Sequence, residues 1–254
     1  MAASPLVTAP GAPAVRIRGL HKRYGRHVAV AGVDLTVARG QIYGLIGPDG
    51  AGKSTLLKAV AGVLTFDAGR VEALGTVIDS ERAAERVKDR LGFMPQGLGH
   101  HLYPELSVDE NVEFFARLRD VPPAVLAARA ERLLGVTRLG DFRDRAMKNL
   151  SGGMKQKLGL VCTLIHEPEL VVLDEPTTGV DAVSRRDFWT ILARLLEARD
   201  VTAFVSTAYL DEATRFDRLA FMHGGRVVAE GEPDEIRARV KGRVVLVRAE
   251  RQLS

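Results

Sequence analysis

The sequence predicts an α/β protein in which helices cover a largely parallel sheet, with an antiparallel β part at the N-terminus and an inserted helical subdomain. Three patterns indicate this fold class. A glycine-rich loop near residue 50 lies between a strand-like run and a helical run. Strand-like and helical patterns alternate before about residue 97 and after about residue 167, and between those positions β-branched runs largely disappear. Such alternation is typical of a parallel sheet covered on both faces.

The elements follow in order along the chain. Residues 1–14 are rich in Ala and Pro and are expected to form a flexible leader rather than a secretory signal. The folded region is expected to span 15–240, and 241–254 to form a basic tail. Alternating apolar residues predict strands at 15–20, 33–37, 71–74 and 77–78. A charged helix over 80–90, capped by Ser80, and a strand over 91–95 complete the first part.

The helical subdomain is predicted over about 97–167. Ser107 and Glu110 have the spacing of a capping box at the start of an amphipathic helix. Further helices are expected after Pro122 and after Ser151. The α/β pattern then returns, with strands over 170–173 and 201–206, helices over 183–199 and 209–215, and a hairpin formed by 219–222 and 226–229.

The glycine-rich loop has the phosphate-binding pattern G-x-x-x-x-G-K-S. It runs through Gly47, Pro48, Asp49, Gly50, Ala51, Gly52, Lys53, Ser54 and Thr55, after a strand over 41–46 and before a helix to 60. Its backbone N–H groups and the helix N-terminus would surround an anion. Lys53 would reach the β- and γ-phosphates, and the Ser54 hydroxyl would hold Mg²⁺. The chain is therefore expected to bind a nucleoside triphosphate on a P-loop nucleoside-triphosphatase core.

Asp174 and Glu175 end the apolar strand at 170–173. Acids at the carboxyl edge of a parallel sheet face its ligand crevice, so Asp174 is expected to hold Mg²⁺ through water and Glu175 to orient or deprotonate an attacking water. Two solvated acids before the turn at Pro176 are the alternative, which the phosphate loop disfavours.

A second anion site is indicated at the start of a helix. Ser151 can cap this helix, and Gly152 and Gly153 leave its backbone N–H groups uncovered. A flexible hinge is the alternative. Two phosphate sites are unexpected in one small domain unless the second serves the nucleotide of another subunit.

Bulk properties limit the function classes. The chain has 254 residues, 46% of them hydrophobic and 27% charged, and no apolar run approaches the length that crosses a membrane. Direct membrane insertion is therefore not expected. A single cysteine, Cys162, excludes an internal disulfide framework, and these features together indicate a cytoplasmic protein. The net charge of +4 is dispersed except near the C-terminus, where a solvated tail is favoured over contact with lipid or nucleic acid.

Together these motifs resemble the nucleotide-binding cassette of ABC transporters. The resemblance covers about 15–240 and rests on the order and spacing of the phosphate loop, Gln96, Leu150-Ser-Gly-Gly, the acidic strand end and Gly179-Val-Asp181. It implies ATP and Mg²⁺ as cofactors and a head-to-tail cassette dimer in which each ATP lies between one phosphate loop and the partner's Ser-Gly-Gly. It also implies a polytopic membrane permease as partner.

The resemblance assigns a role to each matching residue. Tyr24 would stack on adenine, although a core or edge aromatic is the alternative. Gln96 would sense Mg²⁺ and the attacking water, and Asp181 would lie at the dimer seam. Ser151, Gly152 and Gly153 would touch the partner's γ-phosphate. Lys53, Gln96 and Glu175 would form the catalytic group, and Ser54, Gln96 and Asp174 the metal group.

Ala208 departs from the family pattern, which has histidine in the context Ser-Thr-His. Losing one preorganised polar contact costs about 10²–10³ in rate, so slow hydrolysis is expected. Asp49, where many family members have Asn, is a smaller departure. The combined motifs are similar to the first cassette of tandem-cassette bacterial drug exporters of the ABC-2 type and to a ribosome-associated ATPase.

The expected function is the ATP-binding subunit of a bacterial exporter, peripheral on the cytoplasmic face of the cell membrane. Its partner cassette would lie on the same or a different chain. The alternative is a non-transport regulatory or ribosome-associated ATPase. Nucleic-acid maintenance is disfavoured because no heptads of an inserted coiled coil separate the phosphate loop from the Ser-Gly-Gly motif.

Overall fold

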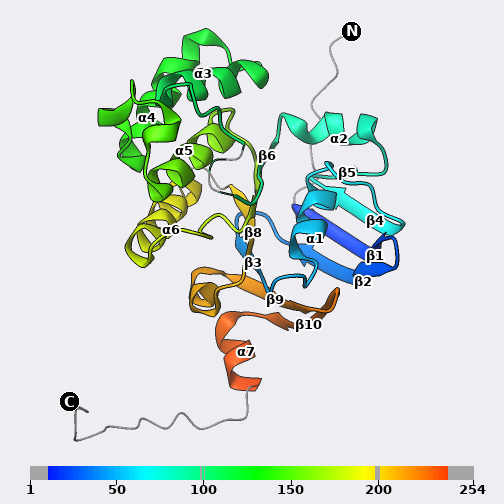
Figure 1. The fold of residues 1–254 in the computed structure, drawn as a ribbon. Helices are drawn as coiled ribbons and strands as arrows, with labels where there is room; N and C mark the ends of the chain where they lie inside the picture. Colours follow the sequence, from blue (N-terminus) through cyan, green and yellow to red (C-terminus); the bar gives the residue numbers. More distant parts are fainter. Residues whose placement is uncertain (1–10, 98, 100, 198–200, 240–254) are drawn as a thin grey trace, which may run out of the picture.

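The computed structural model describes residues 11–97, 99, 101–197 and 201–239. Most of the expected leader and the whole basic tail therefore lie outside the described residues. Ala14, placed in the leader by the sequence, is fully buried, and its N–H donates to the carbonyl of Val37 at 2.9 Å. The described chain forms two sheets with a helical region on one side (Figure 1).

The larger sheet carries the strand ends that build the site. Its order is β10-β9-β3-β8-β7-β6, and the strands are β3 (Ile42–Ile46), β6 (Leu91–Met94), β7 (Leu170–Asp174), β8 (Thr202–Thr207), β9 (Arg218–His223) and β10 (Arg226–Gly231). All neighbours are parallel except β9 and β10, which form an antiparallel hairpin. The carboxyl ends of β3, β7 and β8 therefore meet at one edge of the sheet.

The smaller, antiparallel sheet has the order β2-β1-β4-β5. It consists of β1 (Val15–Tyr24), β2 (His27–Val37), β4 (Ala68–Ala73) and β5 (Thr76–Val77). The first two strands are longer than the sequence predicted, because register shifts after Ile17, Leu20 and Lys22 break the simple alternation of apolar residues. The added length brings Tyr24 to the end of β1 and close to the phosphate loop.

The inserted region is helical, as predicted. It contains α3 (Val108–Leu118), α4 (Pro123–Thr137) and α5 (Gly152–Leu164), with short 3₁₀ turns at Gly140–Phe142 and Met147–Asn149. The capping box is confirmed, since Ser107 accepts from the N–H of Glu110 and the Glu110 carboxylate accepts from the N–H of Ser107.

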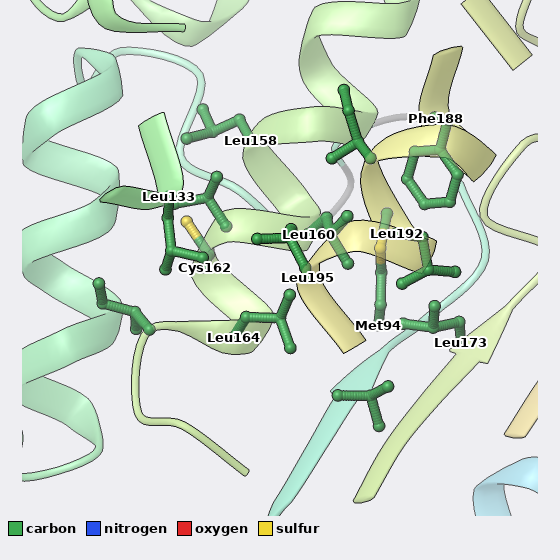
Figure 2. Close-up of a cluster of buried hydrophobic side chains, with 14 of the residues drawn as sticks. Met94, Leu133, Leu158, Leu160, Cys162, Leu164, Leu173, Phe188, Leu192 and Leu195 are labelled. Atoms are coloured by element: carbon green, nitrogen blue, oxygen red, sulfur yellow. The ribbon is translucent and has the colours of Figure 1, made fainter. Parts of the chain in front are cut away.

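One apolar core joins the helical region to the sheet. Side chains from α5, from α6 (Ala182–Glu197) and from the strands β6 and β7 interdigitate, among them Leu158, Leu160, Leu192, Met94 and Leu173 (Figure 2). Burying such side chains contributes about 1.5–3 kcal/mol each. Cys162 lies in this core, where burial raises the pKa of its thiol and keeps it unreactive.

The remaining helices are short. They are α1 (Lys53–Val60), α2 (Glu81–Lys88), a 3₁₀ segment at Leu210–Arg215 and α7 (Pro233–Arg239). Of these, only α7 was not predicted from the sequence. Ser80 caps α2 by accepting from the N–H of Ala83 at 3.3 Å, as expected. Within the described residues no helix combines the length and apolar character that crossing a bilayer requires.

Candidate nucleotide-binding site

The phosphate loop connects β3 to α1, and close backbone contacts require glycine at two of its positions, Gly47 and Gly52. A Cβ at Gly47 would lie 2.2 Å from the carbonyl oxygen of Met222 on β9. A Cβ at Gly52, whose φ is +101°, would lie 2.2 Å from the carbonyl oxygen of Ala29 on β2. No side chain caps α1, so side chains leave its first N–H groups available to another partner. This arrangement suits an anion at the helix N-terminus.

Lys53 folds back over the loop that it ends. Its ammonium donates to the carbonyls of Gly47 at 2.7 Å and Pro48 at 3.1 Å, and it pairs with Glu175 Oε1 at 3.0 Å. Both side chains are almost fully buried, with exposed fractions of 3% for Lys53 and 5% for Glu175. A buried charge requires a partner, and here the ammonium and the carboxylate satisfy one another.

Asp174 lies at the end of β7 and is fully buried. Its Oδ1 accepts from the hydroxyls of Ser54 at 3.0 Å and Ser206 at 2.7 Å, while Oδ2 has no hydrogen-bond partner among the described residues. Burial raises the pKa of Asp174, and the hydroxyls of Ser206 and Ser54 act in the opposite direction. The buried Oδ2 of Asp174, which has no partner among the described residues, and the nearby Ser54 hydroxyl are oxygen donors of the kind that Mg²⁺ prefers.

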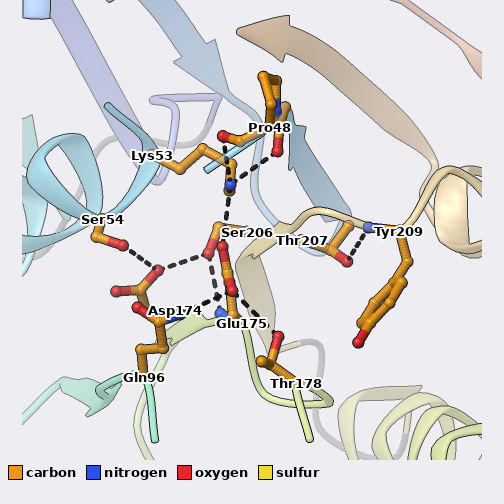
Figure 3. A network of polar contacts seen from close by, with 11 residues as sticks. Pro48, Lys53, Ser54, Gln96, Asp174, Glu175, Thr178, Ser206, Thr207 and Tyr209 are labelled. Carbon is orange, nitrogen blue, oxygen red and sulfur yellow. Dashed lines mark hydrogen bonds and ion pairs between the residues drawn. The ribbon is translucent and has the colours of Figure 1, made fainter. Parts of the chain in front are cut away.

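Glu175 turns out of the strand toward the phosphate loop. Its φ of +47° lies in the left-handed region, which a non-glycine residue adopts only at a cost. Its Oε2 accepts from Gln96 Nε2 at 2.9 Å and from the hydroxyl of Thr178 at 3.1 Å (Figure 3). Both carboxylate oxygens are thus engaged, and the side chain is held between Lys53 and Gln96.

A pocket of about 310 Å³ opens in front of this group. Its walls come from the β1–β2 turn, the phosphate loop and the acidic strand end, namely Tyr24, His27, Ala29, residues 49–55, Gln96 and Glu175. Tyr24 is 48% exposed, and the Lys22 ammonium lies 5.4 Å from the centre of its ring. The structure therefore places the predicted stacking aromatic and the phosphate loop around one cavity.

The Ser-Gly-Gly motif and Asp181 form a separate group that does not line this pocket. Ser151 caps α5 by accepting from the N–H of Met154 at 3.3 Å. Asp181 caps α6 by accepting from the N–H groups of Ser184 at 2.9 Å and Val183 at 3.0 Å. Hydrogen bonding from Ser184, and to a smaller extent from Val183, lowers the pKa of Asp181. A Cβ at Gly153 would lie 2.8 Å from the side chain of Ser184, so the two helix starts lie side by side.

Ala208 follows β8 and is exposed. It lines a second, apolar cavity of about 530 Å³ together with Pro48, Leu210 and His223. The Tyr209 ring is directed away from the acidic residues (Figure 3), and the Arg185 guanidinium stacks on it at 4.3 Å. The only histidine among the described residues that line the nucleotide pocket is His27.

Three polar residues of the site were not predicted from the sequence. Ser206 bridges Asp174 and the backbone of Glu175, Thr178 holds the Glu175 carboxylate, and His27 lines the pocket. Ser206 had a detectable signal, since it is a polar residue that follows the apolar middle of β8 near the carboxyl end of a strand in a parallel sheet.

Comparison with known proteins identifies the family. The ABC transporter family model matches residues 30–178, more than half of the chain. The daunorubicin resistance ATP-binding protein DrrA3 of Streptomyces coeruleorubidus is 41% identical over 232 residues, covering 90% of this chain and 71% of that protein. The chain belongs to the ABC transporter family. The resemblance stated from the motifs is confirmed, and the family is one of ATP-hydrolysing cassettes.

Further relatives support the same assignment. The probable multidrug ABC transporter ATP-binding protein YbhF of Escherichia coli is 41% identical over 236 residues, and this chain spans 40% of its length. The structure of CbiO1 from Clostridium perfringens superposes with a TM-score of 0.82 at 26% identity, covering 90% of this chain and 92% of that one. The ADP conformation of the cassette MJ1267 superposes with a TM-score of 0.77 at 26% identity, covering 90% of this chain and 96% of that one. The predicted α/β fold class is confirmed.

Proposed function

We propose that this cassette binds Mg·ATP in the pocket between Tyr24 and the phosphate loop and powers an exporter. One observation carries the proposal: the start of α1 (Lys53 and Ser54) and the segments that follow β6 (Gln96) and β7 (Glu175) line the same cavity, whose lining also includes Tyr24. Adenine would stack on Tyr24, and the triphosphate would lie in the loop from Gly47 to Thr55.

Magnesium would be held by the Ser54 hydroxyl, by Asp174 through water and by Gln96. The orphaned Oδ2 of Asp174 is the observation that supports this assignment. When bound, Mg²⁺ neutralises charge on the β- and γ-phosphates. Mg²⁺ is commonly held by one or two carboxylates together with substrate phosphates, so the phosphates would supply the remaining ligands.

Glu175 would position and deprotonate the attacking water. In this structure the Glu175 carboxylate pairs with the Lys53 ammonium and accepts hydrogen bonds from Gln96 and Thr178. A bound γ-phosphate offers Lys53 a stronger anionic partner, so Oε1 of Glu175 would become available to water. Before ATP binds, Lys53 and Glu175 would thus neutralise each other's charge. Afterwards, Lys53 would pair with the phosphate and Glu175 would act on the water.

A second cassette would complete each site. The start of α5, with exposed Ser151 and the adjacent Gly152 and Gly153, lies outside the pocket of its own chain, next to the Asp181 turn. A head-to-tail pair would bring this helix start to the partner's γ-phosphate and place Asp181 at the seam. Closing and opening of such a pair would drive a polytopic permease at the cytoplasmic face of the membrane. An export role is supported by the Nod factor export ATP-binding protein I of Ralstonia nicotianae, which is 38% identical over 225 residues, and it suits the drug-resistance and multidrug-transporter names of DrrA3 and YbhF.

The direct test is nucleotide binding by the purified chain. Lys53→Ala is expected to weaken Mg·ATP binding at least about tenfold, because a charge-assisted contact to the phosphates is lost. Lys88→Ala serves as matched control, because Lys88 is a partly exposed lysine of α2 that pairs with Glu85 and does not line the nucleotide pocket. Undiminished binding by Lys53→Ala would contradict the proposed site.

Co-purification tests the transport role separately. Recovery of a polytopic membrane subunit with the chain is expected. Recovery of ribosomal RNA in its place would favour the ribosome-associated alternative.

A further inference from the structure

We infer that Ser206 is a positioning residue that sets both carboxylates of the site, fixing Asp174 so that one of its oxygens remains free for the metal. The inference rests on the proposed function, because it concerns the same Mg·ATP site. Ser206 is the next-to-last residue of β8, the strand that pairs with β7, and its register partner across the two strands is Asp174.

The contacts of Ser206 run in two directions. Its hydroxyl donates to Asp174 Oδ1 at 2.7 Å and accepts from the N–H of Glu175 at 2.9 Å. The same N–H also approaches the carbonyl oxygen of Ser206 at 3.2 Å. A single hydroxyl therefore binds the side chain of one acid and the backbone of the next (Figure 3).

The bond to Asp174 decides which carboxylate oxygen is available. Ser54 and Ser206 both donate to Oδ1, and Oδ2 is left without a partner in the described part of the protein. The Ser54 hydroxyl is itself assigned to the metal, so Ser206 is the donor that holds the carboxylate independently of the metal. Without Ser206, the carboxylate could rotate and the Oδ2 position would no longer be preorganised.

The bond to Glu175 stabilises a strained turn. Glu175 has a φ of +47°, and from this conformation of the backbone its side chain meets Lys53 and Gln96. Such a conformation persists where neighbouring contacts hold it. Ser206 supplies the shorter of the two hydrogen bonds to the Glu175 N–H.

Ser206 acts through these neighbours and not on the nucleotide. It is fully buried and does not line the pocket. An ordinary buried hydroxyl that merely satisfies its own hydrogen bonds would affect stability alone. A positioning residue would change the response to magnesium, and this difference separates the two interpretations.

The experiment measures binding of a fluorescent ATP analogue across a Mg²⁺ titration and, separately, in excess EDTA. For Ser206→Ala, half-saturation is expected at about tenfold higher Mg²⁺, since a hydrogen bond to a charged group is lost, while binding in EDTA stays unchanged. Ser206→Cys keeps the shape of the side chain, slightly enlarged, with a weaker donor, and is expected to give an intermediate shift.

The matched control is Thr202→Val on the same strand. The Thr202 hydroxyl is buried and accepts from the N–H of Gly40 at 2.9 Å, at the opposite end of β8 from the site. Its loss is expected to lower the melting temperature without moving the Mg²⁺ titration. An equal shift in Thr202→Val would overturn the inference, because general loosening of the strand would then explain it.

A double-mutant cycle with Asp174→Asn gives a second readout. If Ser206 acts through Asp174, adding Ser206→Ala to Asp174→Asn should change the Mg²⁺ dependence by less than about twofold. A full tenfold effect in that background would overturn the inference while leaving the proposed function intact. Failure of the wild-type chain to bind Mg·ATP would overturn the proposed function itself.

Discussion

Lys53 and Glu175 form a buried ion pair across the mouth of the phosphate loop, with Nζ and Oε1 3.0 Å apart. The pair joins the residue that would bind phosphate to the residue that would activate water. Each side chain neutralises the charge of the other, and both are almost fully buried. Binding and hydrolysis should therefore respond in opposite directions when the pair is broken from the acidic side.

Glu175→Gln is expected to retain or tighten Mg·ATP binding and to lower hydrolysis by at least about 10². The amide cannot accept the proton of water, and it no longer competes with the phosphates for Lys53. Equilibrium binding and steady-state phosphate release measure the two effects. Glu169→Gln is the control, since Glu169 pairs with Arg39 and Arg90 away from the pocket. Weaker nucleotide binding in Glu175→Gln would contradict the expected competition.

Gly52→Ala is expected to lower the melting temperature and to abolish nucleotide binding. The new Cβ would lie 2.2 Å from the carbonyl oxygen of Ala29 on a backbone with φ of +101°. Gly135→Ala provides the opposite case, because a Cβ at this position in α4 meets nothing within 4 Å. It should stabilise the protein by about 0.5–1 kcal/mol through helix propensity, without changing binding. Calorimetry of Gly52→Ala and Gly135→Ala measures both effects, and equal melting temperatures of the two variants would contradict the prediction.

His166 is expected to make the protein less stable as the pH falls. Burial, and next the Arg119 guanidinium, lower the pKa of His166 to about 4 from the usual 6.5. Its Nε2 lies 3.3 Å from the carbonyl oxygen of Leu91. Because the folded pKa is depressed, the unfolded chain takes up the proton first. The contribution of the neutral His166 to the free energy of unfolding is therefore fully present above about pH 6.5. As the pH falls toward 4, the free energy of unfolding decreases by about 3 kcal/mol.

Denaturant unfolding of wild type and His166→Gln between pH 7 and pH 4.5 measures this effect. The two free-energy curves should converge as the pH falls, since the glutamine carries no titrating group. Parallel curves would show that protonation of His166 does not contribute to acid destabilisation.

The sequence predicted those parts of the site that local spacing determines. The loop from Gly47 to Ser54 and the two acids after an apolar strand lie within single strand-to-loop units. Their meeting follows because parallel strands end at the same edge of a sheet. The ion pair of Lys53 with Glu175 and the bond of Ser54 to Asp174 agree with that expectation.

Features that depend on strand pairing between distant segments were not predictable in the same way. The role of Ser206 requires that β8 be the neighbour of β7 in a particular register. The full length of β1 and β2 is obscured by register shifts, although it is what carries His27 and Tyr24 to the pocket. Helix α7 is short and has no buried residue, so the sequence shows no hydrophobic periodicity that would predict it.

Restoring the family histidine is expected to accelerate hydrolysis. Ala208 follows β8 and lines the apolar cavity that the loop residue Pro48 also lines, and its methyl group offers no hydrogen bond to a γ-phosphate or to water. Ala208→His adds one polar contact, which can change the rate by about 10²–10³. Because the added group contacts the reacting phosphate, the maximal rate should rise more than the affinity for ATP.

Steady-state ATPase assays, of the chain alone and mixed with a candidate partner cassette, measure this change. Ala128→His, on an exposed position of α4 distant from the pocket, is the matched control and should leave the rate unchanged. If the wild-type chain alone already turns over ATP as fast as cassettes that have the histidine, and Ala208→His only slows it, the alanine does not limit hydrolysis. A large increase on adding the partner cassette would instead show that the two chains form composite sites, with the histidine supplied by the partner.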